Sequence, residues 1–495
     1  MDSNATSDNA PSDSPAAPSP SVSNVPDLLR VGTIPDNTAI DVETDILDSV
    51  VFNQSFCRFQ LQNKGILHSN SKITLSASQS SASNIRSFFP VGVGIHALID
   101  RAVLKVGTKT ICEVEDYGHF AAYQSLFISG EHNKEREQYT TARLMNHETF
   151  YTNPVASGAV VDGNASMSGG QNADALVKGL CAGRDLDQFA DRSDYATPPE
   201  IGSIYVQPFQ TIGYNPQFQV NLSDLFPFLK TSQLPLYMMK EPVSLELFWV
   251  SNLKRYCRNS GNTQTFDVDM VQTRCQMVAD YIYYPQELMS QYAQQNANLS
   301  FAYVDYRLAK RTIDATSGRN LILNIGGAGR ICNKVIQSLS KDSILGENVL
   351  NNFQSKGPNA SLTAEDVAST NGSLTYNLRY NDHFLFPVDV VNNARHFHNI
   401  VQTEGKVPFI TRQEYSGEGL VLGGQIEEYT QTGQLTNSFF YLANRLNRNE
   451  RVNSRGIEAY IDYNTLPAGN HTLRLYIEMV RMASLNNGML NIQYA

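Results

Sequence analysis

Two glycine-rich stretches have a composition that can cradle a phosphate group. They are Gly326-Gly327-Ala328-Gly329-Arg330 and Val91-Gly92-Val93-Gly94. A phosphate loop needs a following Lys-Ser/Thr pair, or a helix that opens directly after a parallel strand. Neither stretch has either feature. Because glycine clusters mostly mark tight turns, we interpret both as turns and predict no cofactor and no cofactor-binding residues.

Histidine and acidic residues come close together at two places. His396-x-His398 offers two imidazoles to a metal ion, but no third ligand stands at a suitable spacing. Glu113, Asp116 and His119 form the densest group of acids with a histidine, and such a group can move protons. It lacks a serine, a cysteine or a second carboxylate in a recognisable catalytic arrangement, so we interpret it as loop polarity. We therefore predict no catalytic residues, no metal ligands and no enzymatic activity.

Two further groups of charged residues have simpler interpretations. The first, interpreted as a solvated helix face, is His132, Lys134, Glu135, Arg136 and Glu137. The second, the clearest basic cluster, is Arg445, Arg448, Arg451 and Arg455. A solvated loop accounts for these arginines, and the alternative is that they meet the acidic N-terminal segment or another subunit.

Composition limits the class of protein. A chain of 495 residues predicts two or three domains, and 41% apolar with only 17% charged residues predicts a folded chain with an uncharged polar surface. Phenylalanine and tyrosine supply almost all of the aromatic residues, which suits strands better than helices. The net charge of −10 argues against a specific nucleic-acid partner, because such a protein needs a basic face.

The cysteines are scattered and contain no Cys-x-x-Cys pair. They are Cys57, Cys112, Cys181, Cys257, Cys275 and Cys332. We expect free, mostly buried thiols in a reducing compartment. The sequence has no apolar run near the ~20 residues of a membrane span and no secretory signal pattern.

The stretch at residues 240–250 has the alternation of a strand with one face against a core, and the rest of the chain is organised around it. The predicted inward residues are Val243, Leu245, Leu247 and Trp249, and the predicted outward residues are Ser244, Glu246 and Phe248. Residues 222–237 form an apolar run broken by two prolines, which predicts a packed crossover into this strand.

Similar β character lies on both sides of this strand. Strands are expected in the first half at residues 55–62, 72–78, 94–106, 109–113 and 268–284, and in the second half at 301–313, 320–325, 330–339, 374–380, 457–461, 473–479 and 490–494. Helical spacing is found near residues 117–127, 286–296 and 390–401. Each half also has one long polar excursion, at residues 117–199 and 342–373. The pattern predicts two β-sandwiches of similar design.

The crossover and strand at residues 222–250, with Asp-Leu-Phe-Pro-Phe-Leu and Lys-Glu-Pro-Val-Ser-Leu-Glu-Leu, resemble the central segment of double jelly-roll major capsid proteins of the polinton-like virus and virophage type. Gln-Met-Val-Ala-Asp-Tyr-Ile-Tyr-Tyr at residues 276–284, with the helix that follows, resembles the end of that family's first jelly roll. The strand after Asn487-Gly488 resembles its closing strand. The likeness covers residues 40–495. The Glu-Arg pair of relatives in nucleocytoplasmic large DNA viruses is absent, which places the chain nearer the small-virus branch.

The resemblance implies an all-β fold of two tandem eight-stranded jelly rolls with long loops and a few short helices. The implied division is a flexible N-terminal arm at 1–40, a first jelly roll at 41–285, a helical linker at 286–299 and a second jelly roll at 300–495. The implied function is a major capsid protein whose homotrimers form pseudo-hexameric capsomers of an icosahedral double-stranded DNA virus. Its partners would be neighbouring capsomers, penton proteins and minor capsid proteins, its location would be the virion, and it would have no small-molecule substrate.

Two other classes compete with this interpretation. A tandem β-sandwich that binds or cleaves carbohydrate would need an aromatic platform with paired carboxylates or a calcium site, and the chain has a single tryptophan. A minor capsid or penton protein with one jelly roll is disfavoured because the β pattern runs through both halves.

Overall fold

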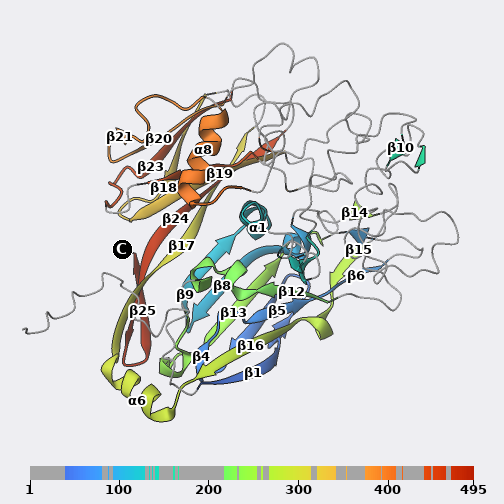
Figure 1. The fold of residues 1–495 in the computed structure, drawn as a ribbon, viewed down its shortest axis with the longest axis vertical. Coiled ribbons are helices and arrows are strands. Elements are labelled where there is room, and N and C mark those ends of the chain that lie inside the picture. The colour runs from blue at the N-terminus through green and yellow to red at the C-terminus, as the bar shows by residue number, and fades with distance from the viewer. Residues whose placement is uncertain are drawn as a thin grey trace, which may run out of the picture.

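The computed structural model confirms an all-β chain whose strands form two sandwiches (Figure 1). It describes residues 40–80, 87–88, 93–128, 133, 136–137, 140–143, 160–161, 165–166, 217–230, 233–253, 258–259, 267–313, 320–341, 353, 374–391, 393–408, 415, 440–446, 450–463 and 470–494. The predicted N-terminal arm up to residue 39 and most of both predicted excursions lie outside these ranges.

The first sandwich consists of two facing antiparallel sheets. One has the order β1-β16-β5-β12 with β4 beside β16, and the other has the order β2-β3-β13-β8-β9. The strands are β1 Asp41–Asp48, β2 Val51–Phe52, β3 Phe56–Leu61, β4 Ile66–Leu67, β5 Lys72–Leu75, β8 Ile99–Val106, β9 Lys109–Glu115, β12 Phe218–Asn221, β13 Val243–Trp249 and β16 Gln276–Tyr283.

The second sandwich also consists of two antiparallel sheets. One has the order β17-β24-β19-β22 with β25 beside β24, and the other has the order β18-β23-β20-β21. The strands are β17 Asn298–Ile313, β18 Asn320–Gly326, β19 Cys332–Lys341, β20 Leu374–Tyr380, β21 His383–Phe384, β22 Leu442–Arg445, β23 Ile457–Tyr463, β24 His471–Asn486 and β25 Met489–Tyr494.

Both sandwiches have the strand order of a jelly roll. The first has eight main strands, in chain order β1, β3, β5, β8, β9, β12, β13 and β16, and the second runs from β17 to β24. In each, one sheet has the order first-eighth-third-sixth and the other has the order second-seventh-fourth-fifth. Two interlocked Greek keys give this order. The fold is therefore two jelly rolls in tandem, as predicted.

The central strand β13 lies between β3 and β8 and confirms the predicted alternation. Val243, Leu245 and Leu247 are fully buried, and Trp249 is 4% exposed. Glu246 points to the other face, but it is also buried, because two long basic side chains from the neighbouring strands cover it. Arg58 lies 2.6 Å and Lys105 also 2.6 Å from its carboxylate. Burial alone would raise the pKa of Glu246, and these two hydrogen bonds lower it instead.

The strand predicted at residues 94–106 is only partly correct. A 3-10 helix, η2, covers Gly94–Leu98, and β8 begins at Ile99. The η2 residues, His96 included, are all buried, so the alternation of Ile95, Ala97 and Ile99 does not mark an exposed and a buried face and cannot separate a strand from a buried helix. The remaining small strands form the ribbons β6–β15, β7–β14 and β10–β11, with bounds β6 Ala77–Ser80, β7 Ser87–Phe88, β10 Val160–Val161, β11 Ala165–Ser166, β14 Arg258–Asn259 and β15 Asp267–Met270.

The two predicted excursions are not equivalent. Residues 117–199 follow the fifth strand of the first sandwich, whereas residues 342–373 lie between the third and fourth strands of the second. The equivalence lies elsewhere, because each sandwich has a helix after its fifth strand. These helices are α1 Tyr117–Ser125, after β9, and α8 Asn393–Glu404, after β21.

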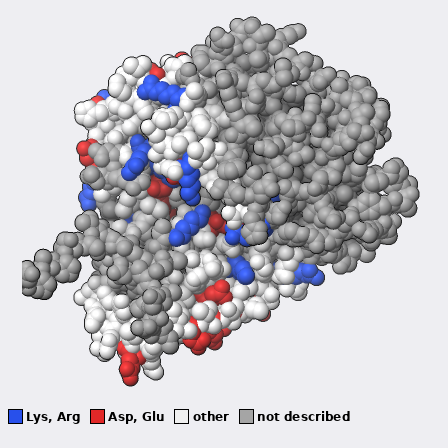
Figure 2. Space-filling model, in the orientation of Figure 1, with Lys and Arg blue, Asp and Glu red and all other residues white. Residues whose placement is uncertain are grey.

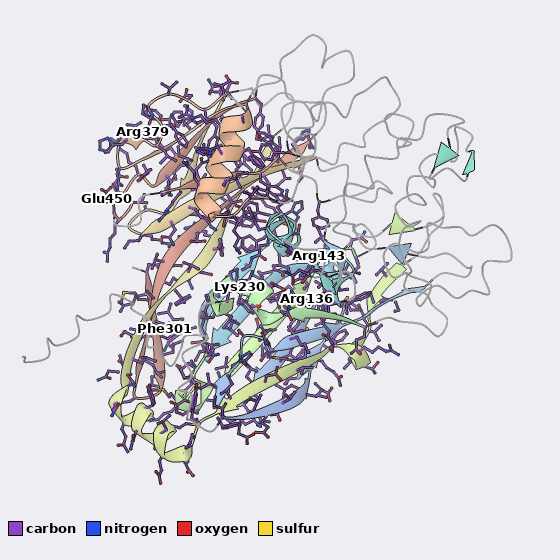
Figure 3. All side chains as sticks on the ribbon, viewed as in Figure 1. Arg136, Arg143, Lys230, Phe301, Arg379 and Glu450 are labelled. Carbon is purple, nitrogen blue, oxygen red and sulfur yellow. The ribbon has the colours of Figure 1, made fainter. Side chains whose placement is uncertain are left out.

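Two long strands join the sandwiches. The linker helix α6, Gln286–Gln295, leads into β17, which pairs with β24 along its whole length of 16 residues. The lower part of these strands lies beside the first sandwich and the upper part belongs to the second (Figure 1). Phe301 marks the lower part in Figure 3. The remaining short helices, α5 Leu222–Leu225, η6 Pro227–Lys230 and η7 Leu236–Met238, form the predicted crossover, and η9 covers Gln272–Arg274. No helix among the described residues has the length and apolarity needed to cross a bilayer.

Candidate functional site: the junction between the two sandwiches

Asp116, from the predicted acid–histidine group, lies at the centre of the junction between the sandwiches. It precedes α1 with a left-handed backbone (φ 50°), and its carboxylate faces β24 and β17 of the second sandwich. Arg474 Nε lies 2.5 Å and Lys310 Nζ 2.8 Å from one carboxylate oxygen, Oδ2. Burial would raise the pKa of Asp116, but Arg474 above all holds it well below its usual value. Asp116 is therefore the charged partner of Arg474 and Lys310 at neutral pH.

The other two members of that group have different partners. His119 is buried, and its Nδ1 lies 3.1 Å from Asp116 Oδ1. Burial, reinforced by Arg474, lowers the pKa of His119 to about 4, so the imidazole is neutral at neutral pH. The Glu113 side chain pairs with Arg101 at 3.1 Å. The structure therefore brings Asp116 and His119 together and directs the Glu113 carboxylate elsewhere.

A second buried polar cluster joins α1 to α8. Lys334 Nζ on β19 lies 2.8 Å from Glu404 of α8 and 3.2 Å from Glu478 of β24. Tyr123 of α1 donates its hydroxyl hydrogen to Glu404 at 2.6 Å, and Tyr306 of β17 donates to Glu478 at 2.6 Å. Burial would raise the pKa of Glu478, but Lys334 lowers it. Every charge in the cluster thus has a partner, which buried charges require.

A third contact fixes β9 against the lower part of the long strands. Arg481 on β24 donates to the carbonyl oxygens of Thr110 at 3.1 Å and Ile111 at 2.9 Å, and its guanidinium lies 3.1 Å from Asp305. Asp305 in turn accepts a hydrogen bond from the backbone N–H of Glu113 at 3.2 Å. The backbone carbonyl and N–H groups at this edge of β9 therefore find hydrogen-bond partners in side chains of the second sandwich.

Aromatic rings fill the space between these polar contacts. Phe120 of α1 lies with its ring centroid 4.6 Å from Tyr306 and 5.4 Å from Tyr476 of the second sandwich. Tyr123 lies 5.3 Å from Tyr441. Contacts of this geometry add to the burial of apolar area. The junction is packed like a protein interior, so it holds the two sandwiches in one orientation.

The glycine-rich stretch after β18 is a turn, as predicted. Gly326, Gly327 and Gly329 have positive φ angles of 99°, 84° and 71°. The N–H of Gly326 donates to Asn324 Oδ1, that of Gly329 to the carbonyl of Val452, and that of Arg330 to the carbonyl of Gly327. Three of the five amides of this stretch therefore already have acceptors within the chain. In the other stretch, Val91 and Gly92 lie outside the described residues.

The two histidines of His396-x-His398 point to different environments. His396 is buried with Nε2 3.0 Å from the carbonyl oxygen of Leu374, whereas His398 is exposed. Burial lowers the pKa of His396 to about 4. In the described part of the chain, no three His, Cys, Asp or Glu residues come close enough to hold a metal ion.

The charged run near residue 136 is not simply a solvated face. Glu137 is 3% exposed and lies 3.4 Å from Arg143, so that prediction is wrong at this residue. His132, Lys134 and Glu135 lie outside the described residues. Figure 3 labels Arg136, Arg143 and Lys230 near α1.

The arginine cluster is split between different surroundings. Arg455 pairs with Asp382 at 2.8 Å, and Arg445 and Arg451 are exposed. Arg448 lies outside the described part of the chain. Of the cysteines, Cys57, Cys112, Cys275 and Cys332 are buried free thiols, as predicted, and Cys181 and Cys257 are not described.

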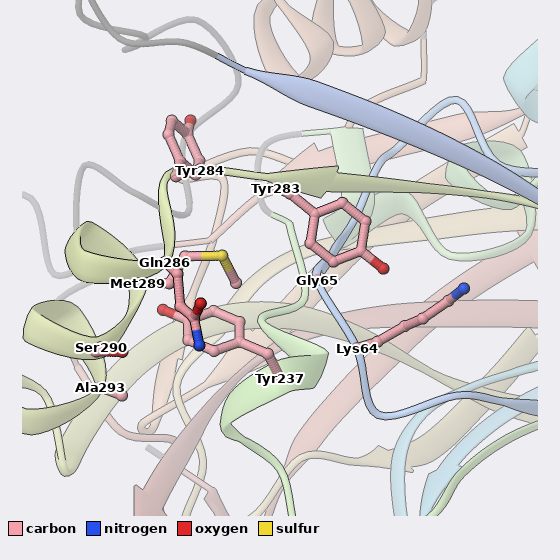
Figure 4. Close-up of a pocket in the computed structure, with 9 residues that line it drawn as sticks. All are labelled: Lys64, Gly65, Tyr237, Tyr283, Tyr284, Gln286, Met289, Ser290 and Ala293. Carbon is pink, nitrogen blue, oxygen red and sulfur yellow. The ribbon is translucent and has the colours of Figure 1, made fainter.

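A cavity of about 490 Å³ lies between α6 and the first sandwich (Figure 4). Tyr237, Tyr283 and Tyr284 line it together with Met289 of the helix. Its one basic group, Lys64, is already paired with Asp45 at 2.7 Å and Glu43 at 3.2 Å, and these partners raise its pKa. The cavity therefore has no cation available for an anionic ligand.

Comparison with known proteins gives matches by structure only. No protein-family model and no curated protein matches the chain. The chain is similar to PBCV-1 VP54, whose crystal structure was fitted into a cryo-EM reconstruction of the virophage Sputnik. The two chains are 10% identical, the match covers 94% of this chain and 99% of that chain, and the TM-score is 0.49. It is similar to a chain of the Sputnik virophage structure, with 10% identity, 99% and 93% coverage and a TM-score of 0.49. It is also similar to the mavirus major capsid protein, with 10% identity, 100% and 96% coverage and a TM-score of 0.42.

Proposed function

We propose that this chain is the major capsid protein of a double-stranded DNA virus of the polinton-like or virophage type. Three copies would form a pseudo-hexameric capsomer, and many capsomers would form an icosahedral shell. The observation that carries the proposal is the presence of two jelly rolls with the same strand order in one chain. Three such chains present six similar units around an axis, which makes a threefold ring nearly sixfold.

The buried junction supports this role. A ring of six units closes only if the angle between the two units of each chain is fixed. Directional charge pairs across the junction, such as Asp116 with Arg474 and with Lys310, fix that angle better than apolar packing alone. Within the proposal, the division of the chain is an arm at 1–40, jelly rolls at 41–285 and 300–495, and a helical linker at 286–299.

The proposed partners are neighbouring capsomers and the penton and minor capsid proteins of the same virus, and the proposed location is the virion. The carbohydrate-binding alternative has no support at the chain's single tryptophan, because Trp249 is 4% exposed inside the first sandwich and cannot form a sugar platform.

Mass by light scattering on gently purified protein, followed by negative-stain imaging of the same peak, tests the proposal. We expect a species of three times 55.0 kDa with a hexagonal outline. We also expect the isolated monomer to be unstable at dilute concentration, because obligate oligomers lose stability on dissociation. A monodisperse monomer that never assembles would refute the proposal, and glycan binding would then be tested.

A further inference from the structure

Inside each chain, one specific pair of surfaces joins the sandwiches. The first sandwich contributes its fifth strand, β9, and the helix that follows, α1. The second sandwich contributes the outer face of its first and eighth strands, β17 and β24. Tyr306 and Tyr476 lie on that outer face, and Phe120 of α1 packs on both rings. This contact is the internal template for how one jelly roll meets another.

The equivalent face of the first sandwich is partly open: among the described residues, two of its apolar side chains are exposed, whereas Ile282 is 5% exposed. Its first and eighth strands, β1 and β16, pair Val42 with Ile282 and Ile46 with Val278. Cross-strand partners point to the same side, and this side is opposite to Tyr281, which faces the core. Val42 is 58% and Ile46 67% exposed, although both are apolar and both belong to a sheet. We call these four paired residues the β1 face.

The equivalent edge of the second sandwich also carries exposed apolar residues among those described. Its fifth strand is β21, and three large apolar residues on and after it are exposed: Phe384 at 51%, Val388 at 70% and Val391 at 44%. We call these three residues the β21 edge. Figure 1 shows β21 and β1 on opposite sides of the molecule, as a head-to-tail contact between copies requires.

The charges around the two surfaces are complementary. On the side of the β1 face the acidic residues are Asp48 and Asp280, whose partners are the uncharged Gln276 and Thr44, and the one basic residue is Lys72 of β5. Asp41, Glu43 and Asp45 point to the other side, where Lys64 pairs with Glu43 and Asp45. Figure 2 shows acidic side chains over the lower end of the first sandwich, where β1 and α6 lie.

Beside the β21 edge, Arg395 on α8 and Lys406 after it are exposed, and neither has a carboxylate within ion-pair distance among the described residues. The acidic residues nearby are engaged within the chain, because Asp382 pairs with Arg455 and Asp389 accepts a hydrogen bond from Asn377 at 2.7 Å. The β21 edge is therefore an apolar surface beside basic residues, and the β1 face is an apolar surface beside acidic residues.

We propose that the β21 edge of one chain docks on the β1 face of the next copy of this chain. The contact repeats between copies the arrangement of β9 and α1 on β17 and β24 within a copy. Each copy offers one edge and one face, so the contact can repeat from copy to copy, and three such contacts close the ring in the proposed trimer. The inference rests on the proposed function, since it specifies how the capsomer is held together.

Four single substitutions and one matched control test the contact. Ile46→Asp and Val388→Asp each place a charge in one of the two surfaces. Ile322→Asp is the control, since Ile322 is 62% exposed on the edge strand β18 but belongs to neither surface. We expect Ile46→Asp and Val388→Asp to raise the concentration at which half of the chains are trimeric by roughly tenfold or more. We expect Ile322→Asp to change it by less than about twofold.

The sign of the introduced charge gives a second readout that loss of folding cannot imitate. Val388→Lys brings a cation to the acidic β1 face and should preserve more trimer than Val388→Asp. Ile46→Lys brings a cation to the basic margin and should preserve less trimer than Ile46→Asp. Native mass spectrometry over a dilution series measures all five variants, and circular dichroism verifies their folding.

The outcomes separate this inference from the proposed function. If the wild-type chain is monomeric at every concentration, the proposed function fails. If the wild type is trimeric and the Ile46 and Val388 variants behave like Ile322→Asp, the docking contact is refuted while the function stands. A trimer that weakens equally with either sign of charge at Val388 also contradicts the complementary charges argued above.

Discussion

His396, the buried histidine of α8, should make the free energy of unfolding decrease as the pH falls. His396 contacts Leu374 through Nε2, and burial lowers its pKa from 6.5 to about 4. In the unfolded chain the imidazole takes up a proton near pH 6.5, and in the folded chain only near pH 4. Between these values the unfolded state binds more protons, so stability is full above pH 6.5 and is lost as the pH falls toward 4.

The size of the effect follows from the two pKa values. For a shift of this size, the loss is about 2 kcal/mol by pH 5 and about 3 kcal/mol by pH 4. His396→Gln keeps an N–H that can donate to the Leu374 carbonyl but cannot titrate. The pH dependence of the variant should therefore be shallower than that of the wild type by that amount.

Urea unfolding at about pH 7.5 and about pH 5 measures the difference, because the free energy of unfolding falls linearly with denaturant. His398→Gln is the control, since His398 is exposed on the same helix and its replacement should leave the slope with pH unchanged. Equal pH dependence of the wild type and His396→Gln would refute the reasoning, because it would mean that the imidazole has the same pKa in the folded and the unfolded chain.

Two further predictions concern packing at particular residues. Lys334→Met leaves two buried carboxylates without their cation and should destabilise the protein by about 3–5 kcal/mol at neutral pH. The control Lys406→Met replaces an exposed lysine and should change the stability by less than about 0.5 kcal/mol. Equal urea midpoints for the two variants would contradict the importance of the buried cluster. Gly94→Ala would place a Cβ 2.0 Å from the carbonyl oxygen of Thr141 at φ 62°, whereas Gly405→Ala has φ 67° and open space around it. We expect Gly94→Ala to lower the stability by over about 2 kcal/mol more than Gly405→Ala, measured by thermal unfolding, and similar values for the two would show that the backbone can move apart.

Local patterns predicted the strands well because their period is a property of neighbouring residues. The alternation around Trp249 places β13, and the turn at Gly107 places the end of β8 and the start of β9, whereas the predicted start of β8 is five residues too early. The burial of Glu246 was not predictable in this way. It depends on Arg58 and Lys105, which reach it from strands distant in sequence.

The contacts of the junction could not be predicted from the sequence either, because they also join residues that are far apart in the chain. Asp116 and Arg474 are separated by 358 positions, and only the strand order of both sandwiches brings them together. The density of acids and histidine near residue 116 was interpreted as loop polarity, and this was wrong for Asp116 and His119, which are buried in the junction. The sequence did not reveal that Arg474 is the partner of Asp116, because no local pattern distinguishes this arginine from others in the strands of the second half.

The same topology explains why a tandem jelly roll suits a closed ring. A strand sheet with two faces and two edges can be covered on every side only if each unit has a neighbour on both sides. In the single chain, the first sandwich covers the outer face of β17 and β24 with α1, but no described element covers Ile46 on its own equivalent face. The second sandwich likewise presents Val388 with nothing described against it. In the proposed docking contact, the β21 edge meets the β1 face, and each is the topological counterpart of a surface that is already buried inside the chain. Ring closure is then the arrangement in which every copy satisfies both.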